Sequence, residues 1–543
     1  MTNSWIVIGT GKDQRVELVS KTGTKGVLPK GSYLTIIDDE DEALFILCVE
    51  DSYVQYPYSP SPLIVDMDLD GINADLKGQN HIFARKVRDL HRRDDGLINT
   101  PQLRSIARRS NQNELDLAMD IKSEKQKPGP EVFLATVYDN ENQVLMDDNQ
   151  IPLYTYLKDD FIFYQTLVVG KTGSGKTVAT KYLAQYFIEK NQNAGSVLAI
   201  NVKDVDFLKM YEASDDVTDS IKKEWAVLGK EAHPVKNFRV YYPANIEISP
   251  SKGINSEMTT PVTLDVVSIE PEALTGLLQS ITDIGAQYLP DIFRYWRAYE
   301  TKNVQNNKIK SIRFKSFVDW FNDIHAESED RERKDHFDTE NLRGEPGYVK
   351  LASGTAENVL RCLKKAEIYF DNEDATILTA DDILSPGMMS VIDIEDEKAK
   401  TFGSVILRHL LHQIVKKNSG MTRNPILIII DEVHQFYNTE SSKEALGDLD
   451  TICRQGRSQK IGVIFSSQTP SDIPKGLINV INTKLFFKSD VGTIKAHGIV
   501  VSDSEMQNLD AGYAIVNVHG MTQLKMVKFP LAYAGVMKTQ GDY

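Results

Sequence analysis

The pattern of apolar residues changes along the chain at about residue 161. In residues 1–150, short runs of β-branched and aromatic residues alternate with Gly, Pro and Asp turns at nearly regular spacing. The runs are SWIVIG, RVELVS, GSYLTIID, ALFILCVE and SPLIVDMD. This pattern predicts a small β-barrel or sandwich. Between Asp75 and Lys125, the basic stretches ARKVRDLHRR and RSIARRS are expected to be helical, and EVFLATVYDNENQVLM then predicts a β-hairpin.

From about Phe161 the apolar runs become continuous and are separated by loops and helical stretches. They are TLVVG, SVLAINV, FRVYYP, MSVIDI, ILIIID, GVIFSS and TKLFFKS. Strands buried on both faces have this composition, so residues 151–543 predict an α/β domain with a central parallel sheet covered by helices. Residues 271–345 predict a helical insertion. The charge run ESEDRERKDHFDTE in its last part is expected to be a solvated linker or helix face rather than a binding tail.

Composition narrows the class of protein. No apolar run approaches the roughly 18 residues that a membrane helix needs, and the first residues lack the pattern of a secretory signal. The three cysteines, Cys48, Cys362 and Cys453, are too widely separated for a disulfide framework or a metal pattern. We therefore expect a soluble, cytoplasmic protein that does not associate with a membrane. The formal net charge of −15 argues against a surface that coats nucleic acid, but it leaves room for a local DNA-binding patch.

The segment GKTGSGKT carries the clearest chemistry. Its spacing fits G-x-x-x-x-G-K-[ST], with an apolar strand before it and a helix after it. Glycines clear space for backbone N–H groups to surround a phosphate, and the helix N-terminus favours an anion. Lys176 would contact the β- and γ-phosphates, and the Thr177 hydroxyl would bind Mg²⁺. The predicted ATP-binding residues are Gly170, Lys171, Thr172, Gly173, Ser174, Gly175, Lys176, Thr177 and Val178.

A second candidate lies in NPILIIIDEVHQF, where an apolar strand ends in two acidic residues. Asp431 stands at the strand's carboxyl tip, where Mg²⁺ bound to phosphates would be held. Glu432 follows it and could activate the water that attacks the γ-phosphate. Two acids can also simply mark the end of a strand, but the phosphate loop upstream favours the catalytic interpretation.

The segment RQGRSQKIGVIFSSQTPSDIP supplies three further candidates. Gln468 ends a predicted strand and could orient water and sense the γ-phosphate. Arg454 and Arg457 precede that strand, and either one could act as an arginine finger on the nucleotide of a neighbouring subunit. Either could equally be an ordinary surface cation.

Five other residues are weaker candidates. Asp204 and Asp206 end the second strand of the predicted sheet, where a capping role is as good an explanation as catalysis. His434 lacks the spacing of a zinc ligand and suggests local packing or coupling. His409, like His412, is expected to be an ordinary helical residue.

Together these segments resemble HerA-type ATPases of the wider HerA–FtsK group. GKTGSGKT, INVKDVDF, PGMMSVIDI, ILIIIDEVH, RQGRSQKIGVIFSSQTPSDIP and INTKLFFK occur in the order found in that family. The resemblance implies a RecA-like motor domain, preceded by a small β-barrel and interrupted by a helical bundle. It further implies an ATP- and Mg²⁺-dependent hexameric ring that moves double-stranded DNA and serves a partner nuclease or other effector enzyme. Lys176, Glu432, Gln468 and one of the two arginines would be its catalytic residues.

Two features depart from a general DNA motor, namely the marked acidity and the charged segment 327–345. They leave open a second hypothesis, in which the NTPase ring is a scaffold that assembles and activates an effector in antiviral defence. A third, a pump at a membrane as in conjugation, is disfavoured because no membrane segment is evident.

Overall fold

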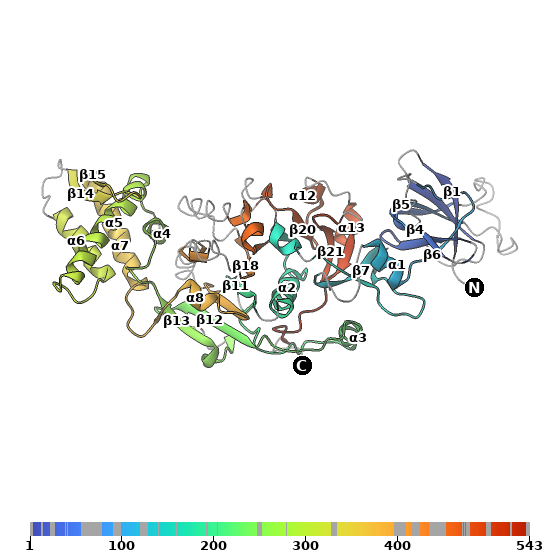
Figure 1. Ribbon diagram of the computed structural model, residues 1–543, viewed down its shortest axis with the longest axis horizontal. Helices are drawn as coiled ribbons and strands as arrows, with labels where there is room; N and C mark the ends of the chain where they lie inside the picture. The colour runs from blue at the N-terminus through green and yellow to red at the C-terminus, as the bar shows by residue number, and fades with distance from the viewer. Residues whose placement is uncertain are drawn as a thin grey trace, which may run out of the picture.

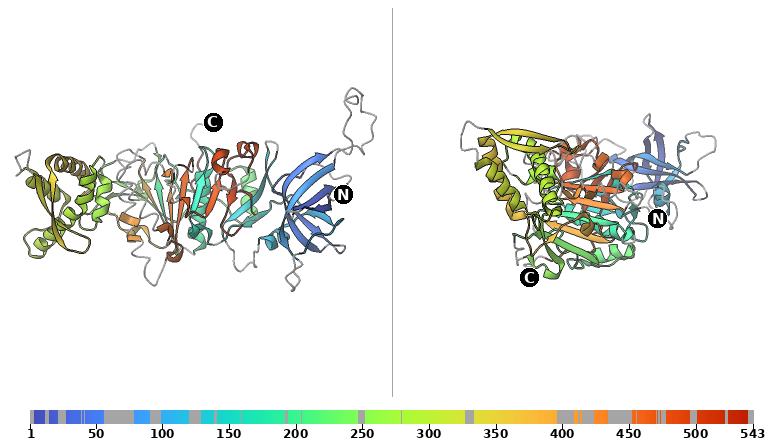
Figure 2. Two further views of the ribbon diagram at one scale, coloured as in Figure 1. Left: turned by 90° about the horizontal axis from the view of Figure 1, so that it is seen from above. Right: turned by 60° about the vertical axis from the view of Figure 1, so that its left-hand side comes forward.

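The computed structural model places three parts along its long axis (Figure 1). A barrel lies at one end, a large sheet in the middle, and a mostly helical insertion at the other end; the view from above shows the same order (Figure 2). The structure describes residues 4–11, 15–21, 28–55, 79–90, 99–119, 129–138, 141–246, 252–326, 334–395, 409–433, 452–495 and 501–538, except 39, 41, 159, 192–193, 204, 279, 412, 415–423, 455, 470, 472, 474–477 and 522–523.

The N-terminal part is a closed antiparallel barrel with the strand order β1-β2-β5-β4-β3-β6. Its strands are β1 (Trp5–Thr10), β2 (Arg15–Ser20), β3 (Tyr33–Ile37), β4 (Ala43–Gln55), β5 (Gln79–Asp89) and β6 (Ile106–Arg109). Alternate residues fill the interior: Trp5 and Val7 from β1 and Val16 and Leu18 from β2 are almost completely buried. The barrel expected from the sequence is therefore present. The SPLIVDMD run lies outside the described residues.

The prediction that the basic stretches are helical was wrong for the residues described. Residues 84–89 belong to β5, and RSIARRS contains β6. Ile82 and Ala84 of β5 and Ala107 of β6 point into the barrel core, and the basic residues follow them along the strands. The alternation of inward and outward side chains that marks a strand could not be recognised in the sequence, because few positions in these stretches carry an apolar side chain.

One short helix, α1 (Gln112–Ala118), does lie in this region and packs against the barrel. Asn111 and Glu114 form its capping box. The Glu114 carboxylate also accepts hydrogen bonds from Thr35 Oγ1 (2.8 Å) and from Arg108 Nη2 (2.7 Å). This buried carboxylate therefore ties the start of the helix to strands β3 and β6.

The central sheet has the order β16-β13-β12-β17-β11-β18-β19-β10-β20-β21-β22-β7-β8, with β9 on the side of β7. Strands from β16 to β20 are parallel, and the remaining pairings are antiparallel. The parallel strands are β10 (Thr166–Val169), β11 (Ser196–Asn201), β12 (Asn237–Pro243), β13 (Thr259–Thr263), β16 (Thr376–Ile377), β17 (Met388–Asp393), β18 (Ile426–Ile430), β19 (Ile461–Ser467) and β20 (Thr483–Phe486). All seven continuous apolar runs thus form strands of one parallel segment, as predicted.

Both faces of this sheet are buried. In β10, Leu167 and Val169 join one hydrophobic cluster, whereas Val168 joins the cluster on the opposite face. Ile428 and Ile429 of β18 divide in the same way. Successive side chains of a strand point to opposite faces of the sheet. Because both faces are buried here, apolar residues follow one another along these strands, and apolar and polar residues do not alternate.

The antiparallel edge joins distant parts of the chain. The predicted hairpin, β7 (Glu131–Tyr138) and β8 (Glu141–Val144), is present and extends the large sheet by pairing with β22. The other strands here are β9 (Tyr154–Tyr156), β21 (Tyr513–Asn517) and β22 (Met526–Lys528). Helices beside the sheet in the described residues include α2 (Lys176–Lys190), α3 (Asp219–Val227), α8 (Ala380–Ile383), α12 (Val491–Lys495) and α13 (Asp503–Gln507).

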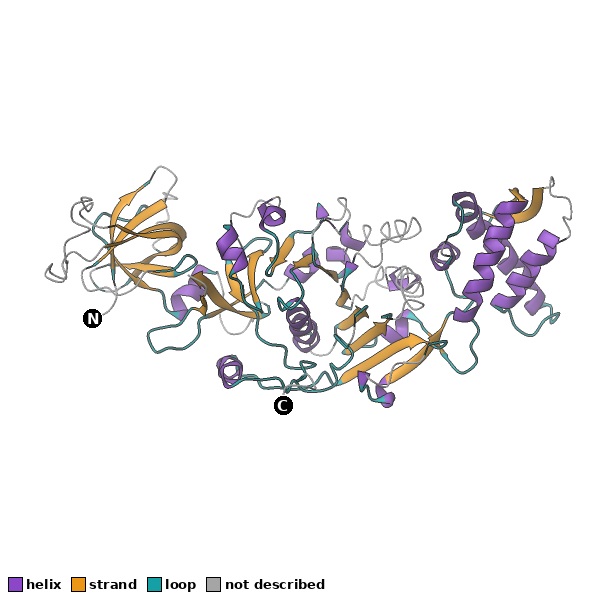
Figure 3. Ribbon diagram, turned by 180° about the vertical axis from the view of Figure 1, so that it is seen from behind, coloured by secondary structure: helices purple, strands orange, loops and turns teal. Residues whose placement is uncertain are grey.

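The insertion is helical but also contains a β-hairpin (Figure 3). Its elements are α4 (Pro271–Leu277), α5 (Asp283–Gln305), α6 (Phe314–Ala326), β14 (Lys334–Glu340), β15 (Pro346–Ala352) and α7 (Ser353–Ala366). The expectation of a linker or helix face was wrong for residues 334–340, which pair with β15. Phe337 is fully buried and stacks on Phe321 with 4.4 Å between ring centroids, so this strand closes the aromatic core of the insertion. Residues 327–333 lie outside the described part.

None of the helices in the described part of the chain is both long enough and apolar enough to cross a membrane.

Candidate active site at the carboxyl edge of the parallel sheet

The loop between β10 and α2 lies at the carboxyl edge of the parallel strands. Strand β10 ends at Val169, and α2 begins at Lys176 with Gly175 as its N-cap. Backbone hydrogen bonds hold the loop against three neighbouring segments: Gly170 N to Ser467 O (3.2 Å), Lys171 N to Lys488 O (2.7 Å) and Gly512 N to Ser174 O (3.0 Å). The loop is therefore fixed by strands on both sides of β10 and by the residue before β21.

The predicted ATP-binding residues lie together in this loop and in the first turn of α2. Lys171, Thr172 and Gly173 are exposed, whereas Ser174 and Lys176 are buried. Thr177 and Val178, in the first turn of α2, are partly buried. A ligand at the loop would thus meet exposed backbone first, with the lysine beneath it.

The glycines are needed for different reasons. Gly173 has φ +77°, and a Cβ there would meet open space, with nothing beyond its chain neighbours within 4 Å. Gly175 has φ +94°, and a Cβ there would lie 2.5 Å from the backbone nitrogen of Gly512. A Cβ on Gly170 would lie 2.5 Å from Ser174 Oγ. Gly173 thus leaves the mouth of the loop clear, while Gly175 lets two backbone segments touch.

We expect Gly175→Ala to lower the Tm by at least about 3 °C more than Gly173→Ala. Both substitutions put an alanine at positive φ, which costs roughly 1–2 kcal/mol. Only Gly175→Ala adds a backbone clash, and overpacking of this kind costs about 1–3 kcal/mol. Thermal unfolding without nucleotide measures the difference. Equal melting temperatures for the two variants would contradict a tight contact with Gly512.

Lys176 folds back over the loop. Its Nζ donates to the carbonyl oxygen of Gly170 and, at 3.3 Å, to that of Lys171. Burial lowers the pKa of the Lys176 ammonium, and the nearby carboxylates of Glu432 and Asp431 act in the opposite direction. The ammonium is therefore a poorly hydrated cation, held between the phosphate loop and two acids.

Asp431 and Glu432 follow directly after β18 and are both buried, with exposed fractions of 4% and 5%. Burial raises the pKa of the Asp431 carboxyl, and the charge of Glu432 adds to the rise. The Glu432 N–H donates to Asp431 Oδ1 at 3.0 Å, and Glu432 has φ +44°. A positive φ at a residue with a side chain costs of order 1–3 kcal/mol and is concentrated at functional sites. The bend turns the second carboxylate out of line with the strand.

Gln468 connects the second acid to the neighbouring strand. It follows the end of β19, and its Nε2 donates to Glu432 Oε1 at 3.1 Å. Strand β19 lies between β10 and β18 in the sheet. The structure therefore brings Lys176, Asp431, Glu432 and Gln468 together at one edge, although 292 positions separate the first residue from the last.

Arg454 and Arg457 lie at the opposite edge of the sheet. Both are exposed and precede the amino end of β19. The Arg457 guanidinium lies 4.5 Å from the ring centroid of Tyr164, which ends the short 3₁₀ segment before β10. The seven residues of β19 span roughly 23 Å, so Arg457 does not reach the site of its own chain.

Sequence reasoning missed several residues around the site. Asp393 ends β17 at the same edge, and Lys252 Nζ lies 2.8 Å from its Oδ2. Asn201, at the end of β11, donates to Asp393 Oδ1 at 3.0 Å. Lys181 in α2 is buried, which lowers its pKa to about 8, and it donates to Gly535 O at 2.8 Å. The acid at the tip of β17 could have been found by the reasoning applied to Asp431, whereas nothing local to Lys252 or Gly535 indicated their positions.

Of the weaker candidates, Asp206 lies near the site. Its charge acts on both Lys176 and Lys181, raising the pKa of each against the effect of burial. His409 is buried within a helix beside Gln413, with 2.8 Å between His409 Nε2 and Gln413 Nε2. Asp204, like His412 and His434, lies outside the described residues.

The family comparison matches the segment that contains this loop. The family described as "Helicase HerA, central domain" matches residues 143–414, half of the chain. The chain belongs to the HerA family. The matched segment includes the phosphate loop and the helical insertion, and it ends before β18 of this HerA protein.

Curated relatives match a shorter part. The DNA double-strand break repair helicase HerA of Saccharolobus solfataricus is 25% identical over 173 residues, covering 28% of this chain and 34% of that protein. Its namesake in Sulfurisphaera tokodaii is 26% identical over 196 residues, covering 32% and 39%. The matches thus span little more than a third of the length of these relatives.

Solved structures with a similar chain path include a conjugative coupling protein, TrwB lacking its first 70 residues. Its TM-score is 0.46 at 13% identity, with 79% of this chain and 93% of that chain covered. VirB4 of Thermoanaerobacter pseudethanolicus has a TM-score of 0.43 at 12% identity, with 75% and 97% covered.

Proposed function

We propose that this HerA protein is a cytoplasmic, ATP-hydrolysing DNA translocase that works as a hexameric ring with a partner nuclease or other effector enzyme. The observation that carries the proposal is the convergence of Lys176, Asp431, Glu432 and Gln468 beside a phosphate loop at one edge of a parallel sheet. This is the arrangement that phosphoryl transfer to water requires: a cradle, a cation, a metal-binding acid and a base.

The phosphate loop fits a nucleoside triphosphate. Gly173 leaves open space at its mouth, and the N-terminus of α2 points at the same place. The Lys176 ammonium now donates to loop carbonyls, and phosphate oxygens are stronger acceptors for it than those carbonyls. In this proposal Lys176 binds the β- and γ-phosphates and stabilises the negative charge that moves during transfer.

The remaining roles are to bind Mg²⁺ and to activate the attacking water. Thr177 and Asp431 would hold Mg²⁺, which when bound neutralises charge on the phosphates. Ionised Asp431 suits this role because a nearby divalent cation offsets the burial that raises its pKa. Glu432 accepts the proton of the attacking water. Gln468, hydrogen-bonded to Glu432, holds the carboxylate in place and orients the water.

The curated relatives are named as DNA repair helicases, which supports duplex DNA as the substrate of this chain too. We expect ATP turnover to rise several-fold when duplex DNA is added, because a motor hydrolyses ATP fastest while it moves along its track. Steady-state ATPase assays at low salt, with Lys176→Ala as the background control, measure the rise. Turnover that is unchanged by duplex DNA would count against a translocase.

The ring has a separate test. An arginine at one edge of the sheet and a nucleotide site at the other suit a head-to-tail contact, in which different surfaces of two copies meet and the ring closes. With an ATP analogue at micromolar protein, we expect a solution mass near six times that of the 61.1 kDa chain. Mass photometry or light scattering would detect it, and the mass of a single chain would refute the ring.

A scaffold ring that activates an effector in antiviral defence is the second candidate, favoured by the net charge of −15. Hexamers whose ATP turnover is unchanged by duplex DNA but changes when a co-purified enzyme is added would support this candidate.

A further inference from the structure

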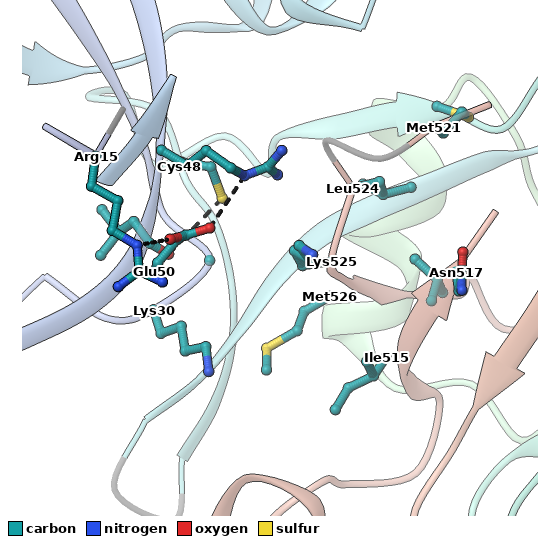
Figure 4. Close-up of a pocket in the computed structure, with 14 residues that line it drawn as sticks. Arg15, Lys30, Cys48, Glu50, Ile515, Asn517, Met521, Leu524, Lys525 and Met526 are labelled. Atoms are coloured by element: carbon teal, nitrogen blue, oxygen red, sulfur yellow. Dashed lines mark hydrogen bonds and ion pairs between the residues drawn. The ribbon is translucent and has the colours of Figure 1, made fainter. Parts of the chain in front are cut away.

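A cavity of about 340 Å³ lies between the barrel and the C-terminal strands of the large sheet (Figure 4). One wall comes from β2, β4 and β5 of the barrel and from the residues just before β3. The other wall comes from β21, from the segment that leads into β22 and from Met526, the first residue of β22. Its volume lies within the roughly 300–1,000 Å³ range of small-molecule sites. None of its lining residues belongs to the phosphate loop.

Cationic side chains line the cavity from both walls: Arg15, Lys30, Arg85 and Lys525. A single carboxylate, Glu50, lines it with them. Glu50 Oε2 lies 3.1 Å from Arg15 Nε, and its Oε1 lies 3.2 Å from Arg85 Nε, so one acid orients two guanidinium groups. Lys30 is paired at 2.9 Å with Glu505 of α13. Among the described residues, these four cations outnumber Glu50 and Glu505, the two carboxylates placed against them, although the whole chain is strongly acidic.

The rest of the cavity is apolar. Its non-polar lining comes mainly from the C-terminal wall: Ile515, Met521, Leu524 and Met526. Burial raises the pKa of the Cys48 thiol to about 11, so this barrel residue stays neutral and adds no charge. Methionine sulfur makes favourable contacts with the edges and faces of aromatic rings. The cavity therefore offers both cationic groups and an apolar surface to one ligand.

We propose that this cavity binds a nucleoside monophosphate. Guanidinium groups pair with phosphate through parallel N–H···O hydrogen bonds, so the phosphate would lie beside Arg15, and the Lys525 ammonium on the opposite wall would add a second positive charge. The flat base would lie against Met526, which Figure 4 shows on the wall that faces Lys30. An inorganic anion would leave this apolar wall unused. The site is independent of the phosphate loop and does not rest on the proposed ATPase function.

Isothermal titration of the full chain with AMP tests the site. We expect binding to wild type, at least tenfold weaker binding to Lys525→Glu, and weaker binding to Arg15→Ala. Both residues are exposed, so the variants should keep the wild-type Tm. Lys308→Glu makes the same charge change on an exposed lysine of the insertion and should bind AMP like wild type.

Three outcomes would overturn the proposal. Wild type that shows no binding at millimolar AMP would exclude the site. Equal AMP affinity of wild type and Lys525→Glu would place the nucleotide elsewhere, including at the phosphate loop. Inorganic phosphate that binds as tightly as AMP would show that the apolar wall contributes nothing, and the assignment to a nucleotide would be wrong. A tenfold preference for AMP over phosphate, lost in Lys525→Glu, would establish it.

Discussion

The Glu432→Gln protein should bind ATP with nearly wild-type affinity and hydrolyse it about 10²–10⁴-fold more slowly, the usual contribution of a general base. The amide has the size of the carboxylate and keeps an oxygen that can accept the hydrogen bond from Gln468 Nε2. It cannot take a proton from water. The loss should therefore fall on kcat, while ATP binding is retained. Single-turnover hydrolysis and a fluorescent ATP analogue measure the two quantities separately.

A matched control comes from an acid outside the site. Glu373 is exposed and paired with Arg313 on the surface, so Glu373→Gln makes the same chemical change far from the nucleotide and should leave turnover unchanged. Wild-type hydrolysis by Glu432→Gln would show that another group activates the water. Loss of ATP binding would instead mean that the carboxylate supports the structure of the loop.

The backbone geometry of Glu432 differs from that of its neighbour Asp431. Asp431 continues the line of β18 and is almost fully buried, whereas the positive φ of Glu432 redirects the chain immediately afterwards. Consecutive residues of a strand would point to opposite faces. The bend lets both carboxylates act on Lys176, whose pKa responds to each of them.

The parallel sheet could be predicted because its strands are apolar on both faces. Ile428 and Ile429 need different clusters, so neither position tolerates a polar residue, and the run stands out in the sequence. The phosphate loop and the acids after β18 could be predicted for a related reason: their chemistry fixes residue types at short spacing. The order of the strands in the sheet brings these segments together, and no local sequence pattern specifies that order.

Other features had no such local signature. Strand β14 was hidden because one of its buried positions is Asp335, whose Oδ2 lies 2.7 Å from His325 Nδ1 and thereby satisfies a buried carboxylate. The contact of Gly512 with Ser174 joins residues 338 positions apart, and a glycine in LDAGYAIV looks like an ordinary turn before a strand. Long-range backbone contacts of this kind need the fold to be known first.

Because of its position, Arg457 can act as the proposed arginine finger only in an assembly of several chains. Its guanidinium lies over Tyr164 at the amino edge of the strands, while Lys176 and Glu432 lie at the carboxyl edge. It can act on a nucleotide only if a head-to-tail contact brings the amino edge of one subunit to the carboxyl edge of the next. Its exposure on the single chain is what such a contact requires.

If Arg457 acts across this contact, Arg457→Ala should bind ATP almost normally and lose about 10³-fold or more of its turnover, since arginine fingers contribute about 10³–10⁵ by stabilising charge in the transition state. Mixing it with Lys176→Ala tests the direction of delivery. In mixed rings, some contacts join the intact phosphate loop of an Arg457→Ala subunit to the intact arginine of a Lys176→Ala subunit. Turnover recovered on mixing, from two proteins that are inactive alone, would establish delivery between subunits.

Arg454→Ala, which changes the other exposed arginine of the segment, is the matched control and should stay active. Full activity of Arg457→Ala would refute the assignment and leave Arg454 as the candidate, because no other arginine of RQGRSQK is available at this edge of the sheet.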